Sequence, residues 1–205
     1  MSEGRLDLGA MRVGEYLERL AAAVPVPGGG AVAGMTLAQA NALGAMVVGY
    51  AIGKPRFAPH DAAHREALTA FESGRLRALD LAAEDAEAYA HLNALWKLPK
   101  DDPRRADFAS AVLGAIAAPK ATLELARATV TALEVLVGTT SAALASDLRI
   151  ALDLALTGAS AAQENVRINL PSVTDESARS AISTSTEALL AEVKARVADA
   201  HARLG

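Results

Sequence analysis

The residue best suited to chemistry is Asp85, in the segment LAAEDAEAYAHLNALW. On a helical wheel Asp85 falls inside the apolar stripe that contains Leu81 and Leu92, whereas Glu87 falls on the opposite face. A carboxylate in a core is costly unless it is paired or its pKa is shifted, which makes Asp85 a candidate catalytic residue. The alternative is that the helix extends past the core here and Asp85 is solvated. Angular drift over several turns leaves both interpretations open.

Three consecutive glycines, Gly28, Gly29 and Gly30, stand between two prolines and a long apolar segment, in PVPGGGAVAG. The triplet does not have the spacing of a Walker or Rossmann phosphate loop. One interpretation is that a ligand approaches the backbone here and meets free N–H groups at the start of a helix. The other is a tight turn between two helices. The glycines alone do not distinguish them.

Several cations lie near predicted helix ends. Lys54 closes a charge-free segment. Lys97 and Lys100 lie around the loop KLPKDDP, shortly before Arg104 and Arg105. Cations near the C-terminus of a helix usually offset its dipole. They equally suit an anionic ligand, such as a molecule with a carboxylate tail.

Polar residues also occur in a predicted helix of the C-terminal third. Asp147 follows Ser146 near its start, and Asn165 and Asn169 lie near its end. An asparagine at a helix end is usually a cap or turn residue. These three residues become site candidates only through the resemblance described below.

The sequence offers little for metal or nucleophilic chemistry. It has no cysteine, which excludes disulfides and thiolate chemistry. His60 and His64 share a helical face, but no glutamate completes an HExxH pattern, and we expect both at the surface. No Gly-x-Ser-x-Gly elbow occurs. We therefore expect no metal site and no serine nucleophile.

The elements that must position these residues are all helical. No strand alternation or internal repeat is present, and we expect an all-α bundle of about seven helices in one domain over 1–205. The prolines at 25, 27, 55, 59 and 119 separate them. The expected helices span 12–24, 31–52, 61–96, 104–117, 119–137, 141–166 and 175–205.

Composition narrows the class of protein. Hydrophobic residues make up 52% of the 205 residues but aromatics only 3%, which favours helices packed through small side chains. The net charge of −4 provides no basic surface for nucleic acid. The N-terminal segment MSEGRLDLGAM has no apolar signal core, so we expect a cytoplasmic protein.

The segment 28–53 has no charged side chain and is long enough to span a bilayer. It also contains Gln39, Asn41 and several glycines, and it is poor in large aliphatic residues. We expect it to form a central buried helix and not a membrane span. Because its small residues lie on more than one face, one copy of the bundle would not cover it, and we expect a homodimer.

An ordered set of motifs resembles the cyclodeaminase/cyclohydrolase family of folate enzymes. The motifs over 25–170 are PVPGGGAVA, an apolar helix ending in IGK, DAEAY, KLPK, AAP, SD and NVRINL. That family includes the C-terminal domain of formiminotransferase-cyclodeaminase and stand-alone bacterial methenyltetrahydrofolate cyclohydrolases. The resemblance implies an all-helical homodimer with a folate site beside the glycine loop and no cofactor beyond the tetrahydrofolate substrate.

The resemblance also implies roles for individual residues. Asp85 corresponds to an acidic residue that the family uses catalytically. The implied substrate-binding residues are Gly28, Gly29, Gly30, Lys54, Lys100, Asp147, Asn165 and Asn169. The implied activity is 5-formimidoyltetrahydrofolate cyclodeaminase, with 5,10-methenyltetrahydrofolate cyclohydrolase at the same site as the alternative.

The chain departs from the family pattern before Ser146-Asp147. Members tend to have Gly-Asn-x-Asn there, whereas this chain has GTTSAAL over 138–144 and no asparagine. If those amides orient the pterin, the ligand is bound differently here. A non-catalytic helical protein that binds a folate-like ligand or a partner helix is therefore a second alternative.

Overall fold

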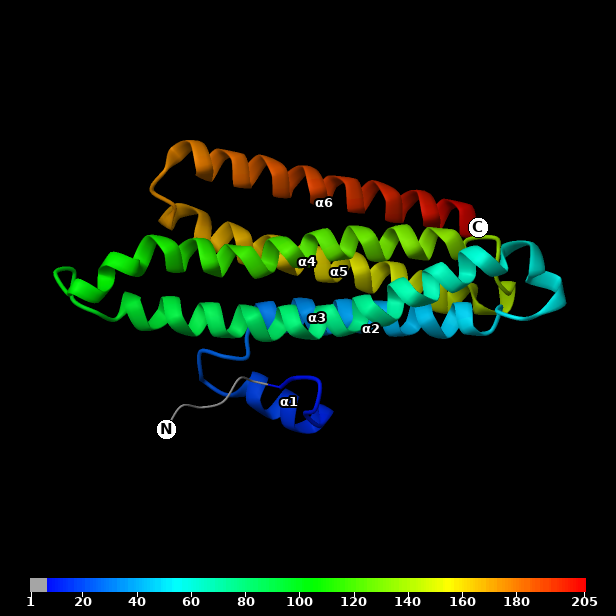
Figure 1. Ribbon diagram of the computed structural model, residues 1–205, viewed down its shortest axis with the longest axis horizontal. Coiled ribbons are helices and arrows are strands. Elements are labelled where there is room, and N and C mark those ends of the chain that lie inside the picture. The colour runs from blue at the N-terminus through cyan, green and yellow to red at the C-terminus, as the bar shows by residue number, and fades with distance from the viewer. Residues whose placement is uncertain (1–6) are drawn as a thin grey trace.

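The computed structural model describes residues 7–205, and their regular structure is entirely helical (Figure 1). Short 3₁₀ turns join several of the helices. The α-helices are α1 (Val13–Ala21), α2 (Gly29–Gly49), α3 (Asp61–Trp96), α4 (Phe108–Leu136), α5 (Ala145–Asn169) and α6 (Glu176–Leu204).

Helices α2 to α5 form a four-helix bundle. Helix α2 packs against α3 and α5, and α4 closes the bundle by packing against the same two helices. Helix α6 lies across α4 and α5, and α1 lies outside the bundle next to α2 and α3 (Figure 1). The core is built mainly from alanine, leucine and valine, as expected for helices that approach closely through small side chains.

The expected central apolar helix is α2. Leu37, Val47 and Val48 are fully buried in it, while Met46 and Tyr50 at its far end are exposed. Among the described residues, Gly29–Gly49 and Pro103–Leu136 are both long and apolar enough to cross a membrane. The second stretch was not anticipated from the sequence. Length and composition of this kind also fit the core helices of a bundle, and both stretches pack inside this one.

The expected count of about seven helices is wrong for residues 7–205, which contain six α-helices. The segments predicted at 104–117 and 119–137 are one helix, α4, with Pro119 in its interior. Proline removes one backbone hydrogen bond and usually breaks or kinks a helix. Here Ala115, Ile116, Leu123 and the proline itself are all buried, so packing on both sides of Pro119 keeps the helix continuous.

His64 is also not where the sequence led us to expect it. Its side chain is fully buried in the first turns of α3, whereas His60 is exposed as expected. His64 Nε2 lies 3.1 Å from Thr139 Oγ1, and that hydroxyl donates to the Val135 carbonyl. The nitrogen therefore donates to Thr139. The contact joins the start of α3 to the segment that follows α4, which explains the burial.

Candidate active site

A pocket opens where the start of α2 meets α3, α4 and the end of α5. It encloses about 270 Å³. The glycine loop, with Pro25 and Val26 shortly before it, forms one wall, α3 provides a carboxylate and a phenol, and α5 provides two amides. The lining residues are Pro25, Val26, Gly28, Gly29, Gly30, Asp85, Tyr89, Ala115, Asn165, Ile168 and Asn169.

Asp85 lies directly against Gly30. A β-carbon added at Gly30 would lie 1.8 Å from Asp85 Oδ2 and 2.0 Å from its carboxyl carbon. No side chain larger than hydrogen fits between the start of α2 and this carboxylate without a shift. Gly30 therefore makes room for a side chain of the same protein, which neither sequence interpretation of the glycines included.

The other two glycines have different surroundings. A β-carbon at Gly29 would lie 3.1 Å from Asn165 Oδ1, a tight contact that requires a small movement of the amide. At Gly28 the nearest atom would be the Pro25 carbonyl oxygen at 3.7 Å, an ordinary van der Waals distance. Gly29 and Gly30 thus each lie against a polar side chain from a neighbouring helix. Of the three glycines, only Gly28 has room beside its backbone for a further atom.

The electrostatics of Asp85 are unusual for a surface carboxylate. Its side chain is half-buried, and burial raises the pKa of the carboxyl to about 6. Among residues 7–205 no cation forms a salt bridge with it. The positive end of the α2 dipole, where Gly28 provides no side-chain cap, acts in the opposite direction and favours the ionised form. The group can therefore accept and return a proton near neutral pH.

Asn165 and Asn169 complete the polar wall of the pocket. Asn169 Nδ2 donates to the Asn165 carbonyl at 2.9 Å and holds the end of α5. Asn165 Nδ2 is buried and has no hydrogen-bond partner within the described part of the chain. A buried amide left unsatisfied costs stability, and a ligand acceptor in the pocket would satisfy it. Capping, the ordinary role of asparagine at a helix end, does not describe Asn165.

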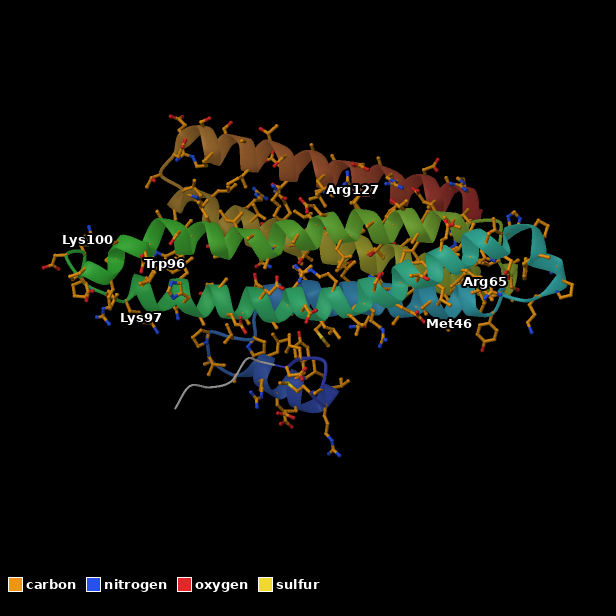
Figure 2. All side chains as sticks on the ribbon, in the orientation of Figure 1. Met46, Arg65, Trp96, Lys97, Lys100 and Arg127 are labelled. Carbon is orange, nitrogen blue, oxygen red and sulfur yellow. The ribbon has the colours of Figure 1, made fainter. Side chains whose placement is uncertain are left out.

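Three of the residues implied by the resemblance lie outside this pocket. Lys54 follows the far end of α2, a helix of 21 residues and roughly 30 Å. Asp147 is in the first turn of α5, whereas Asn165 and Asn169 are at its other end. Lys100 lies in the loop between α3 and α4, beyond Trp96 (Figure 2). A role for Lys54 or Asp147 in this pocket would therefore require a second copy of the chain.

Tyr89, Ile168 and Ala115 line the pocket but were not proposed from the sequence as site residues. A signal existed for Tyr89, because it lies one helical turn after Asp85 and shares its face. Its side chain is 37% exposed, which is consistent with a ring at the rim of the pocket. Nothing in the sequence indicated Ala115, because the approach of α4 to this position depends on tertiary packing.

Several known proteins resemble this chain over most of its length. A model of the formiminotransferase-cyclodeaminase family matches residues 12–188. Formimidoyltransferase-cyclodeaminase of Sus scrofa is 35% identical over 178 residues, which are 84% of this chain and 33% of that protein. The chain thus spans about a third of the length of that curated relative.

Two further relatives match over nearly their whole length. Methenyltetrahydrofolate cyclohydrolase of Methylorubrum extorquens is 28% identical over 185 residues, 88% of this chain and 89% of that protein. The crystal structure of formiminotetrahydrofolate cyclodeaminase from Thermotoga maritima superposes with a TM-score of 0.83 at 26% identity, covering 96% of this chain and 94% of that one.

Proposed function

The chain belongs to the formiminotransferase-cyclodeaminase family, and we propose that it converts 5-formimidoyltetrahydrofolate to 5,10-methenyltetrahydrofolate with loss of ammonia. The observation that carries this proposal is the half-buried Asp85 carboxylate, with its pKa raised to about 6, in a pocket at the start of α2. Relatives named for this chemistry support the substrate class.

Asp85 acts as a proton relay in the proposed reaction. The folate N10 attacks the carbon of the formimidoyl group, whose nitrogen is already protonated as an amidinium, and forms the new ring bond. The ionised Asp85 carboxylate takes the proton that N10 loses. It then returns that proton to the formimidoyl nitrogen, which leaves as ammonia when its bond to carbon breaks. A carboxyl with a pKa near 6 is matched to both halves of this exchange.

The remaining pocket residues bind and orient the folate. The free Asn165 Nδ2 donates to an acceptor of the pterin, and the Tyr89 ring borders the bound molecule. The open backbone at Gly28 allows the flat ring system to approach the start of α2. All of these groups belong to the chain itself, and we propose that no cofactor beyond the folate takes part. We also propose that the protein is cytoplasmic.

Cyclohydrolase activity at the same site is the second candidate. The observation that favours it is the match to the Methylorubrum extorquens cyclohydrolase over 89% of that enzyme, a stand-alone chain of similar extent. In this reaction water attacks the methenyl carbon and Asp85 accepts the proton that the water loses. The same carboxyl then donates that proton to the folate nitrogen released when the ring opens, and the hydroxyl of the intermediate loses its own proton to solvent as the formyl carbonyl forms.

The proposal of a non-catalytic protein rested on the asparagines absent from 138–144. In the structure this segment follows α4 and lies by His64, at the end of the bundle opposite the start of α2. The departure from the family pattern thus lies away from Asp85 and its pocket. This weakens the main argument for a protein without activity.

We also propose a homodimer. Helix α2 has no charged residue, and its outer stripe of Ala42, Met46 and Tyr50 is exposed. Val13 and Leu17 on α1 are exposed as well, at 72% and 54%. A second copy covering both surfaces would remove apolar area from water. Sedimentation at micromolar concentration is expected to show a dimer, and a monomer would contradict the proposal.

The activity is tested by following the methenyl absorbance. Incubation with 5-formimidoyltetrahydrofolate is expected to raise the absorbance with release of ammonia. Incubation with 5,10-methenyltetrahydrofolate tests the second candidate, because hydrolysis lowers the same absorbance. If neither folate changes, the chain is not an enzyme of this class and both proposals are wrong.

A further inference from the structure

Beyond the pocket, α3 carries a surface that the proposed mechanism uses only at Tyr89. Gly30 fixes the start of α2 level with Asp85. Helix α3 runs eleven residues further to Trp96, a rise of roughly 16 Å at about 1.5 Å per residue. Over this length α3 and α4 have passed the start of α2 (Figure 1).

Two aromatic side chains follow Asp85 along this surface. Tyr89 and Trp96 lie four and eleven positions after Asp85, so all three share one face of α3. Tyr89 lines the pocket, and Trp96 packs its ring 6.1 Å from that of Phe108 while remaining 40% exposed. Aromatic residues are only 3% of the chain, so two partly exposed rings in line with the carboxylate are uncommon here.

Two exposed lysines lie at the end of this surface. Figure 2 shows Trp96, Lys97 and Lys100 together at the end of the bundle where α3 meets the loop to α4. Lys97 and Lys100 are exposed and form no salt bridge within residues 7–205. The two arginines of the loop are engaged elsewhere, because Arg104 binds Asp102 and Arg105 donates to the carbonyls of Leu95 and Leu98.

A tetrahydrofolate presents matching chemistry in the same order: a pterin, then a p-aminobenzoyl ring, then a glutamate with two carboxylates. We propose, resting on the function proposed above, that the surface from Tyr89 to Lys100 binds the tail of the folate. Tyr89 and Trp96 pack against the p-aminobenzoyl ring, and Lys97 and Lys100 bind the glutamate carboxylates. Asp101, beside Lys100, disfavours a longer anionic tail at the tip of the loop.

The proposed contact between the lysines and the glutamate is tested by removing the charges of the ligand and then those of the protein. The kcat/KM is measured for the 5-formimidoyl derivatives of tetrahydrofolate and of tetrahydropteroate, which lacks the glutamate. The protein is expected to prefer the folate by roughly tenfold, because two exposed charge pairs are worth that much together. In the double variant Lys97→Ala/Lys100→Ala this preference falls to near unity, because kcat/KM for the folate falls toward the value for the pteroate.

Lys194→Ala is the matched control, since Lys194 is an exposed lysine on α6. It should retain the preference for the folate. A double variant that still prefers the folate would overturn the lysine assignment. If turnover of both substrates is normal and neither variant alters the preference, the tail subsite is wrong while the proposed function stands.

The proposed contact of the ligand with Trp96 can be measured directly by fluorescence, because Trp96 is the only tryptophan in the sequence. Its fluorescence is titrated with 5-formyltetrahydropteroate, with free N-acetyltryptophanamide as the control for absorption by the ligand. Saturable quenching that persists after Lys97→Ala/Lys100→Ala is expected. Absence of quenching while the same ligand inhibits turnover would overturn the contact with Trp96, and failure of the ligand to bind at all would overturn both the subsite and the function.

Discussion

At two contacts between helices of this bundle, a glycine makes space for a polar side chain, but the two polar side chains have different roles. At one, Gly30 of α2 leaves space for the Asp85 carboxylate from α3, with 1.8 Å between an added β-carbon and Oδ2. At the other, Gly74 of α3 leaves space for Asn41 from α2, with 2.4 Å between an added β-carbon and Oδ1. In both, a glycine lets a polar side chain enter a helix interface.

The two polar groups differ in what they contact. Asn41 is 1% exposed, and its amide donates to the Leu37 carbonyl and to Thr129 Oγ1 at 2.9 and 3.0 Å. Asp85 faces a pocket, and its raised pKa comes from burial. A buried polar group that is satisfied ties helices together, whereas one without compensation lowers stability and is retained for another reason. The comparison assigns Asn41 to the fold and Asp85 to chemistry.

The largest expected effect is on turnover at Asp85. Asp85→Asn keeps the shape but removes the titratable group, so kcat should fall by on the order of 10²–10⁴-fold with much smaller changes in substrate binding. Glu87→Gln, an exposed position on the same helix, is the control and should change little. If Glu87→Gln is inactive and Asp85→Asn active, the assignment of the carboxylates is wrong.

The pH dependence of stability should distinguish Asp85 from an ordinary carboxylate. Its folded pKa of about 6 lies above the ordinary value of 3.8, so the folded state holds this proton over a pH range in which the unfolded state has lost it. Stability is therefore highest below about pH 4 for this group and falls as pH rises through 6, by about 3 kcal/mol at most.

Asp85→Asn removes this dependence. By urea unfolding the variant should be more stable than the parent at pH 7.5, and the difference should disappear at pH 4. A difference that is constant with pH would show that the raised pKa is not a feature of the folded protein. In the active protein, kcat/KM should rise with pH through about 6 as the carboxylate forms, because the relay begins with the ionised group.

Matched glycine substitutions test the comparison itself. Gly30→Ala forces the Asp85 carboxylate away from the start of α2, and a displacement of about 1 Å at a reacting group costs on the order of 10² in turnover. Gly74→Ala overpacks the Asn41 contact and should lower the free energy of unfolding by about 1–3 kcal/mol while kcat is retained. Equal loss of turnover in both variants would contradict the distinction between the two contacts.

The smallest expected effect is that of alanine at Gly29, and a larger side chain there should act more strongly. Gly29→Ala places a β-carbon 3.1 Å from Asn165 Oδ1, so the amide must shift by a few tenths of an ångström, and KM should rise by roughly threefold. Gly29→Val adds more bulk beside the pocket and should block folate binding with the fold intact. Gly49→Ala is the control, since Gly49 lies at the other end of α2 and no atom from elsewhere in residues 7–205 lies within 4 Å of an added β-carbon there. Normal binding by Gly29→Val would show that the loop is only a turn.

Local patterns in the sequence were sufficient for much of the fold. The helix predicted over 61–96 is α3 as observed, and the wheel placed Asp85 on the face toward the core, where it is half-buried. These predictions succeed because side-chain periodicity and proline placement act over a few turns of one helix. The family motifs also identified the glycines, Asp85, Asn165 and Asn169, which the structure brings to one pocket.

Only the tertiary structure decided which of these residues meet. Neither Lys54 nor Asp147 reaches the pocket, because each lies at the far end of a long helix whose other end lines it. Pro119 does not end its helix and His64 is not exposed, because packing against neighbouring helices outweighs the local preference. The need for a glycine at position 30 could not be predicted from the local sequence either. Gly30 is needed because it contacts Asp85, which is about 55 residues away in sequence, and long-range packing brings the two together.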